Sequence, residues 1–272
     1  MLFPSIVVFI LGTIFGSFIS VVIYRIHAEK KGIFWGKSEC PYCHKRLNPL
    51  DLIPIFSYLI RGGKCSKCKK HISIHYLLLE LLTGTILLGL FLKFPFIQFE
   101  LGLDPTADTF SFDLPHFINF ASIGIISLFL IAIFFYDLKH KEIPEIFTLP
   151  AIAIVFLVMV IWFRDGFAGM AIGGAIAGLF FGLQVWISKE KWLGAGDTQV
   201  GILMGMLLGW KLVIVAIMLS YIIGSLVSIF LLLAGKVTKK STIPFAPFLV
   251  TGTFIAIFAG DYIINSYLQI LL

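Results

Sequence analysis

The chain has 272 residues, of which 59% are hydrophobic and 13% are charged, and its mean hydropathy is +1.00. Soluble domains carry about 25% charged residues, so this composition excludes a large soluble core and indicates a surface that mostly faces lipid. The formal net charge is +6, but no module that interleaves basic and aromatic residues is evident, so we expect membrane lipid and no nucleic acid as partner.

Apolar segments recur along the whole chain. Runs of about 18 or more apolar residues are typical of membrane-spanning helices. The first segment lacks a basic start and a small-x-small cleavage site, so we expect it to be retained as a helix. The sixth is short for a bilayer about 30 Å thick. We expect eight spans, at 3–24, 75–94, 117–136, 146–163, 167–188, 197–210, 212–234 and 243–260.

The sequence therefore predicts an all-α protein, a polytopic integral membrane helix bundle of about eight transmembrane helices. Three parts are expected: a first transmembrane helix at 1–24, a cytoplasmic cysteine loop at 25–74 and a transmembrane helical core at 75–272. Basic residues set the orientation, because cytoplasmic loops are enriched in Lys and Arg. Of 21 basic residues, eleven lie in 25–74 and seven in the loops at 137–145, 189–196 and 235–242. These loops are expected on the cytoplasmic side, with both termini outside.

All four cysteines lie in the first of these loops, as CPYC and CSKC. Two C-x2-C pairs 21 residues apart have the spacing of a zinc ribbon. Four thiolates would fill a tetrahedral site and leave no position for water, so the expected zinc is structural. The predicted ligands are Cys40, Cys43, Cys65 and Cys68.

Other interpretations of these cysteines remain open. One alternative is four unrelated thiols. Another is a pair of redox-active C-x2-C motifs, but disulfide cycling fits poorly with a reducing compartment. His44, His71 and His75 flank the pairs and are possible substitute ligands. A metalloprotease lacks its simplest signature, because no HExxH occurs.

Acids near the spans are the other candidates for chemistry, because an ionised Asp at the bilayer centre costs about 3 kcal/mol or more. Asp137 ends the third expected span and Asp197 opens the sixth, both at the cytoplasmic rim. If these spans touch, the carboxyls meet and share one proton, as in aspartic proteases. Each acid alone also has a structural interpretation: a membrane boundary for Asp137 and a helix N-cap for Asp197.

Two glycines precede the second acid in GAGD. Gly194 and Gly196 permit a close backbone approach by a substrate strand, or a positive φ, just before the helix begins. Glu80 lies about one turn inside the second span, and an acid there is a candidate for contacting a substrate amine or a methyl donor. The alternative is that neighbouring polar groups satisfy the hydrogen-bonding capacity of the Glu80 carboxylate. Asp261 is expected to mark only a membrane boundary.

Five motifs in order resemble the type IV prepilin peptidases, bacterial membrane aspartic proteases of the GxGD type. These are GSFISVVIYRI at 16–26, the cysteine pairs followed by ISIHYLLLELLTG at 72–84, YDLKHKEIP at 136–144, GAGD at 194–197 and PFAPFLVTG at 244–252. The resemblance extends over nearly the whole chain. It identifies Asp137 and Asp197 with the catalytic pair and the four cysteines with the metal tetrad, and makes 75–272 the protease core.

The resemblance implies an activity. Such enzymes remove the short basic leader of type IV prepilins or pseudopilins at the cytoplasmic face of the inner membrane, after a Gly. Members with the cysteine loop commonly also methylate the new N-terminus, with S-adenosylmethionine as methyl donor. Three local acids, Glu142, Glu145 and Glu190, lie in the loops that carry the two aspartates, and we expect at least one to contact the basic leader.

The chain departs from the family pattern at three positions. Lys139 stands where many members have a second Asp, Glu145 where many have Asp after Ile-Pro, and Gln199 where many have Lys. None removes the pair of aspartates. Two other functions use the same features: a proton-coupled transporter, for which acids near the bilayer midplane are expected, and a membrane zinc scaffold without catalysis.

Overall fold

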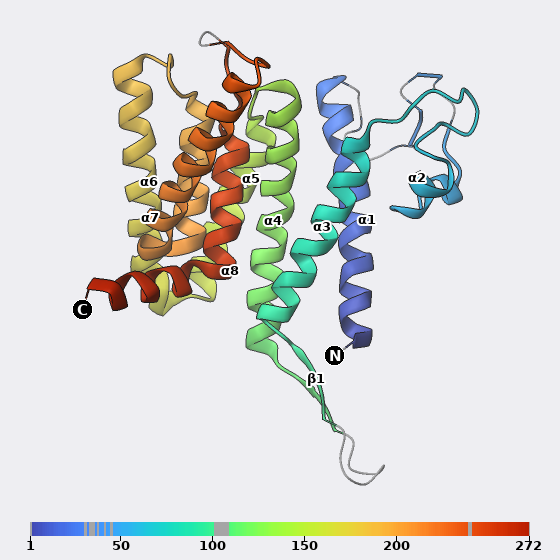
Figure 1. Ribbon diagram of the computed structural model, residues 1–272. Helices are drawn as coiled ribbons and strands as arrows, with labels where there is room; N and C mark the ends of the chain where they lie inside the picture. The colour runs from blue at the N-terminus through green and yellow to red at the C-terminus, as the bar shows by residue number, and fades with distance from the viewer. Residues whose placement is uncertain are drawn as a thin grey trace. The chain divides into compact units, whose positions relative to one another are not determined.

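The computed structural model describes residues 2–29, 32, 36, 38–40, 42–43, 46–100, 109–238 and 241–271. Helices dominate, which confirms the all-α membrane class, and one short hairpin is added (Figure 1). In chain order the elements are α1 (Leu2–His27), η1 (Pro49–Asp51), α2 (Phe56–Ile60), α3 (Ile74–Lys93), β1 (Ile97–Glu100), β2 (Thr109–Phe112), α4 (Leu114–His140), α5 (Glu145–Ile161), η2 (Arg164–Gly166), α6 (Phe167–Ser188), α7 (Ala195–Leu233) and α8 (Ala246–Leu271).

Within the described residues, six helices are long and apolar enough to cross a membrane, so the predicted count of eight spans is not confirmed. Two features account for the difference. The expected span at 146–163 corresponds to α5, which has only 17 residues. The expected spans at 197–210 and 212–234 both fall within the 39-residue α7, whose backbone is non-helical at Gly209, with φ 73° and ψ 173°.

The first compact unit, Met1–Ala132, is built on α1 and α3, which lie side by side (Figure 1). Glycines bring these helices together: a Cβ on Gly12 would lie 2.7 Å from the Cα of Gly84, and one on Gly16 would lie 2.8 Å from the Cα of Glu80. Larger residues at these positions would separate the helices, because the contacted atoms belong to the backbone. Small residues serve the same purpose in many membrane helix pairs.

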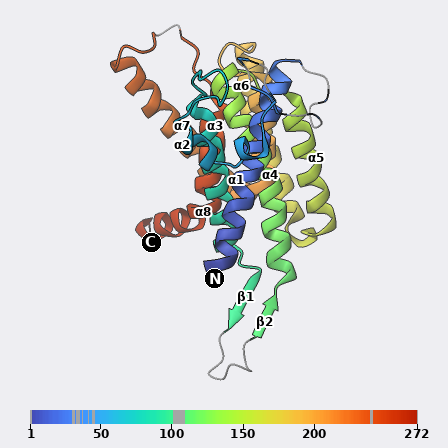
Figure 2. The same ribbon diagram turned by 90° about the vertical axis from the view of Figure 1, so that its right-hand side faces the viewer.

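The hairpin β1–β2 connects the C-terminal end of α3 to the N-terminal end of α4 in this unit (Figure 2). Its strands are antiparallel, with Ile97 opposite Phe112. Phe96 packs at its base against Phe91, Phe117 and Phe120, with ring centroids 5.0–5.2 Å apart. This aromatic cluster ties α3 to α4 although the two helices are separated in sequence.

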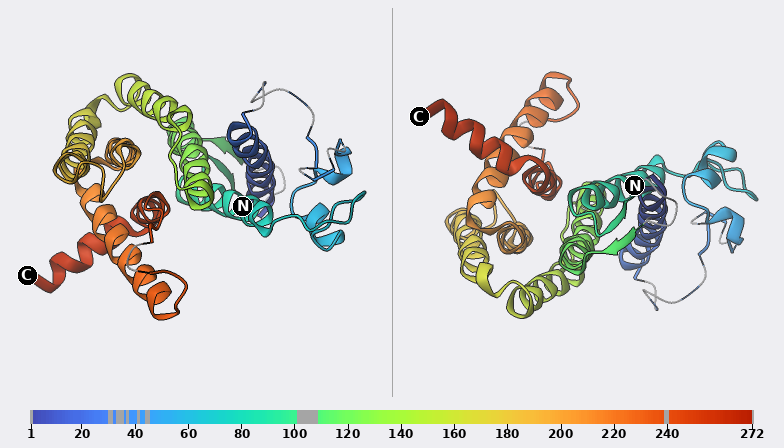
Figure 3. Two further views of the ribbon diagram at one scale, coloured as in Figure 1. Left: turned by 90° about the horizontal axis from the view of Figure 1, so that it is seen from above. Right: turned by 90° about the horizontal axis from the view of Figure 1, so that it is seen from below.

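The second unit, Ile133–Leu272, contains α5 to α8 and the end of α4. A Cβ on Gly178 or Gly182 of α6 would meet Ile202 or Thr198, near the start of α7, whereas Gly169 faces Trp210. Beyond Gly209 the chain returns along α6, since the Tyr221 hydroxyl donates to Gln184. The two parts of α7 therefore run in opposite directions past α6; Figure 3 shows the helices from above and from below.

Candidate active site

Asp137 lies near the end of α4 and is buried, with 4% of its surface exposed. The backbone N–H of Ala246 donates to its Oδ2 at 3.1 Å. Ala246 is the first residue of α8, and the first N–H groups of a helix have no partner within it. The carboxylate of Asp137 thus satisfies the start of a helix that lies 109 residues further along the chain.

Asp197 is the third residue of α7 and is also buried, with 8% exposed. Its Oδ2 accepts a hydrogen bond of 3.0 Å from the N–H of Gly194, the N-cap residue, which is the arrangement that an acid in the first helical turn favours. Its other oxygen, Oδ1, is buried and has no hydrogen-bond partner among the described residues. An unpaired buried polar atom is costly, so this oxygen is available to a water or a substrate group.

The structure brings the two aspartates together in one unit. Gly196, next to Asp197, packs against Ile143, which follows Asp137 by six residues, and each carboxylate accepts a hydrogen bond from a backbone N–H. Both are anchored at helix starts, Asp137 at that of α8 and Asp197 at that of α7. This arrangement leaves Oδ1 of Asp197 without a hydrogen-bond partner among the described residues, in the same unit as a second buried acid.

The two glycines before Asp197 differ in their surroundings. Neither has a positive φ, so that part of the expectation was wrong. A Cβ on Gly196 would lie 2.7 Å from Cβ of Ile143, in the segment that leads into α5, whereas a Cβ on Gly194 would meet only Oδ2 of Asp197, at 3.8 Å. Gly196 therefore permits close contact between two segments of the chain itself. Contact of either glycine with a substrate stays a prediction.

The three loop acids, Glu142, Glu145 and Glu190, are all exposed. Glu145 begins α5 and so also stabilises that helix start. Glu190 follows α6 with a positive φ of 62°. Their exposure is compatible with contact to a basic peptide, and their role in binding one stays a prediction.

Three contacts near the aspartates were not foreseen from the sequence. The buried Thr148 of α5 donates its hydroxyl to the side-chain oxygen of Gln199, two residues after Asp197. Lys141 donates to the carbonyl of Thr242 at 2.9 Å, which ties the segment after Asp137 to the one before α8. The Ala246 N–H was missed as well, although the PFAPF motif ahead of an apolar run is a recognisable helix start.

The four cysteines form a compact cluster in the first unit, and their Sγ atoms all lie within 4.8 Å of one another. Cys40 and Cys68 are 3.9 Å apart, and Cys43 and Cys65 are 4.0 Å apart. Sulfurs bound at about 2.3 Å to one tetrahedral Zn²⁺ would lie about 3.8 Å apart. The cysteines are not joined by disulfides. The spacing fits a closed four-cysteine metal site and disfavours the interpretation as unrelated thiols.

Each C-x2-C pair is enclosed by an isolated antiparallel bridge, Glu39 with Arg46 and Lys64 with His71. The backbone N–H groups of Cys68 and Lys67 lower the pKa of the Cys65 thiol to about 6, which favours the thiolate that a metal needs. Burial raises the pKa of Cys40 to about 11. The described residues place no histidine in the cluster; His44 lies outside them.

Comparison with known proteins gives a consistent assignment. The chain matches the bacterial peptidase A24 N-terminal domain over residues 10–94 and the type IV leader peptidase family over residues 124–229. No solved structure matches the chain. The relatives include three proteins with the name prepilin leader peptidase/N-methyltransferase. They come from Bacillus subtilis (strain 168; 32% identity, 98% of each chain), Stutzerimonas stutzeri (28%; 96% of this chain and 92% of the relative) and Pseudomonas aeruginosa (26%; 96% and 92%).

Identity above 30% over nearly the full length of both chains shows common membership rather than a shared motif. The two matched regions contain the structural features already described: the first holds the cysteine cluster, and the second holds both aspartates. A peptidase assignment also excludes the transporter and the non-catalytic scaffold as alternatives. The chain belongs to the type IV leader peptidase family and is a membrane peptidase.

Proposed function

We propose that the chain is an aspartic endopeptidase that removes the basic leader from type IV prepilins or pseudopilins at the cytoplasmic face of the membrane. The observation that carries the proposal is the buried pair of Asp137 and Asp197, with one carboxylate oxygen left without a partner among the described residues. The names of the relatives supply the substrate class. The excess of basic residues in the loops on the same side as the aspartates supports the cytoplasmic face.

In the proposed reaction the two aspartates share one proton. The ionised carboxylate takes a proton from a water, whose oxygen attacks the scissile carbonyl carbon, while the protonated carboxyl donates to the carbonyl oxygen. The tetrahedral intermediate then collapses: the C–N bond breaks and the leaving nitrogen receives a proton from the pair. The hydrogen bonds from Gly194 and Ala246 keep each carboxylate fixed by one oxygen, so that its other oxygen takes part.

The substrate is expected to arrive with its apolar helix in the membrane and its basic leader outside. Leader residues then face the exposed acids Glu142, Glu145 and Glu190 rather than the basic loops around them. Exposed charge pairs contribute only about 0–1 kcal/mol each. We therefore propose that these acids orient the leader and that the two aspartates catalyse the cleavage.

We further propose that the chain methylates the new N-terminus, as the names of the relatives indicate for those proteins. S-adenosylmethionine would supply a methyl group activated by its sulfonium. The four-cysteine cluster would hold one structural zinc, because four thiolates fill the tetrahedral coordination of the metal and leave no ligand position for water. The metal would then shape the cytoplasmic loop and take no part in hydrolysis.

The test is cleavage of a purified prepilin by the purified chain in detergent. Asp137→Asn and Asp197→Asn should each lower turnover by at least about a thousandfold, because an amide neither takes up nor supplies the shared proton. Asp261→Asn, at an exposed acid far along α8, is the matched control and should cleave normally. Near-normal turnover by either of the first two variants, with intact insertion in the membrane, would overturn the assignment.

A further inference from the structure

The first unit contains a cavity between α1, α3 and the cysteine loop. Its volume is about 150 Å³. That corresponds to on the order of ten waters. The lining includes the rings of Tyr24, Tyr58 and Tyr76 and several apolar side chains, and two of the metal-cluster cysteines, Cys40 and Cys65, form part of the wall.

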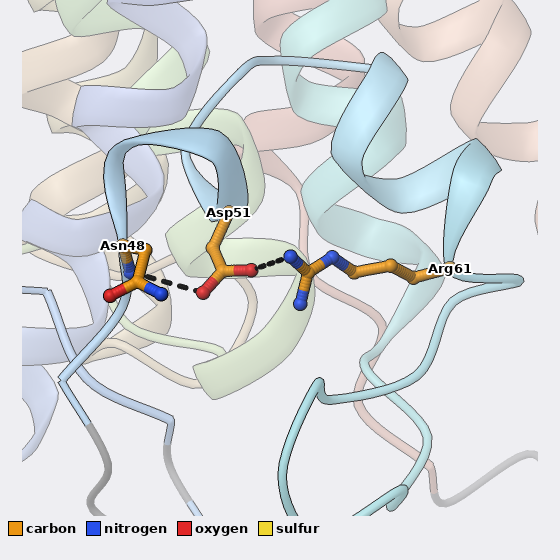
Figure 4. Close-up of polar contacts among 3 residues, drawn as sticks. All are labelled: Asn48, Asp51 and Arg61. Carbon is orange, nitrogen blue, oxygen red and sulfur yellow. Dashed lines mark hydrogen bonds and ion pairs between the residues drawn. The ribbon is translucent and has the colours of Figure 1, made fainter.

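Two of the acids in the wall have different partners. Asp51 forms an ion pair with Arg61 and accepts a 3.0 Å hydrogen bond from the N–H of Asn48 (Figure 4). Its charge is therefore compensated by the protein. Glu80 of α3 is buried, and its Oε2 accepts a 2.7 Å hydrogen bond from the N–H of Ile55. Among the described residues, no Lys or Arg forms an ion pair with Glu80.

A buried carboxylate without a cation is unfavourable in a membrane helix, and such acids mark binding sites for charged ligands. Glu80 opens onto a cavity with three tyrosine rings, and aromatic faces attract cations. Arg25, at the end of α1, also lines the cavity, and its guanidinium donates to the carbonyl of Gly32 at 3.3 Å. A ligand that complements this set carries at least one cation, one anion and a flat apolar part.

We propose that this cavity binds the methyl donor, S-adenosylmethionine. Its sulfonium or ammonium would face Glu80 and the tyrosines, its carboxylate Arg25, and its adenine the apolar part of the wall. The proposal rests on the methyltransferase part of the proposed function. The proposal also explains the role of the cysteine cluster, because a metal that fixes Cys40 and Cys65 would stabilise one wall of the cavity.

Glu80 also has a structural role, which the test must separate from ligand binding. Ile55 has a positive φ of 64°, an unfavourable conformation for a β-branched residue, and the bond from its N–H to Glu80 holds it there. In Glu80→Gln the side-chain oxygen still accepts this bond while the charge is lost. In Glu80→Ala both are lost.

The experiment is equilibrium binding of labelled S-adenosylmethionine to the purified full chain in detergent, without prepilin. The wild-type chain should bind saturably, and Glu80→Gln should weaken binding at least about tenfold while zinc content and melting temperature stay at wild-type values. Glu80→Ala should weaken binding and also lower the melting temperature. Asp261→Asn removes an equal charge elsewhere and should bind normally.

Absence of saturable binding by the wild-type chain overturns the proposal, and so does wild-type affinity in Glu80→Gln. If Glu80→Gln binds the donor normally but loses affinity for a peptide with a mature pilin N-terminus, the cavity belongs to the substrate amine instead and the proposal fails. Cleavage of prepilin by the same wild-type preparation is measured separately. The peptidase proposal is therefore tested independently of donor binding.

Discussion

At the scale of single residues, the two glycines of GAGD have separable roles. Alanine is a better helix former than glycine by about 1 kcal/mol, so Gly196→Ala, inside α7, would stabilise the chain if space allowed. The added Cβ would instead lie 2.7 Å from Ile143. We expect Gly196→Ala to lower the melting temperature and to lower kcat at least about tenfold, because α7 carries Asp197. Thermal unfolding and steady-state cleavage of prepilin measure both effects.

Two further variants test the cause. Ile143→Ala should restore much of the activity of Gly196→Ala, because it removes the side chain that the new Cβ meets. Gly194→Ala places its Cβ in ordinary contact distance only, 3.8 Å from Asp197, and should cost about 1 kcal/mol or less as an N-cap change. If Gly194→Ala and Gly196→Ala have equal effects, the contact with Ile143 is not the reason that a glycine occurs at 196.

At the scale of elements, the cysteine loop should depend on one metal ion. Elemental analysis should find one zinc per chain, and Cys40→Ser should lower that value, because three thiolates bind zinc more weakly than four. Loss of the metal should impair methylation more than cleavage, since Cys40 and Cys65 line the cavity of the first unit while the aspartates lie in the second.

The control for the metal site is His71→Ala. His71 belongs to the bridge that encloses the second cysteine pair, but it is exposed and is not in the cluster. This variant should keep its zinc. A wild-type preparation that is free of metal, stable and reactive at all four thiols would show that the cluster is not a metal site.

At the scale of the whole molecule, the number of membrane crossings follows from the position of the aspartates. If α5 did not cross the membrane, the end of α4 and the start of α7 would lie on opposite faces. Gly196, next to Asp197, packs against Ile143, which follows Asp137 by six residues, so these two ends must share a face. The 17 residues of α5 span about 26 Å, which is close to the thickness of the hydrocarbon core of about 30 Å.

We therefore expect topology reporters fused after residues 140 and 191 to report the same, cytoplasmic side, and a reporter fused after residue 165 to report the opposite side. A fusion after residue 210 should report the outer side too, because the chain reverses at Gly209. A fusion after residue 191 that reports the outer face would show that α5 does not cross and that the arrangement of the aspartates is different.

The membrane class, the cysteine cluster and the two acids at the ends of apolar segments could all be predicted from the sequence. Hydropathy depends on composition, and a C-x2-C pair forms a local knuckle, so neither requires knowledge of distant contacts. The sequence also suggested a break near residue 210, which the backbone at Gly209 bears out, although six helices of the described residues, rather than eight, are long and apolar enough to cross a membrane.

The partners of these residues depend on tertiary contacts and could not be predicted from the sequence. The partner of Asp137 is a backbone N–H at the start of α8, that of Glu80 is a backbone N–H 25 residues earlier, and that of Gln199 is a hydroxyl on α5. Backbone groups have the same chemistry at every position, so no residue type marks them as partners. Which of them meet depends on how closely helices approach, and that is set by contacts such as Gly196 against Ile143, which form only when the chain has folded.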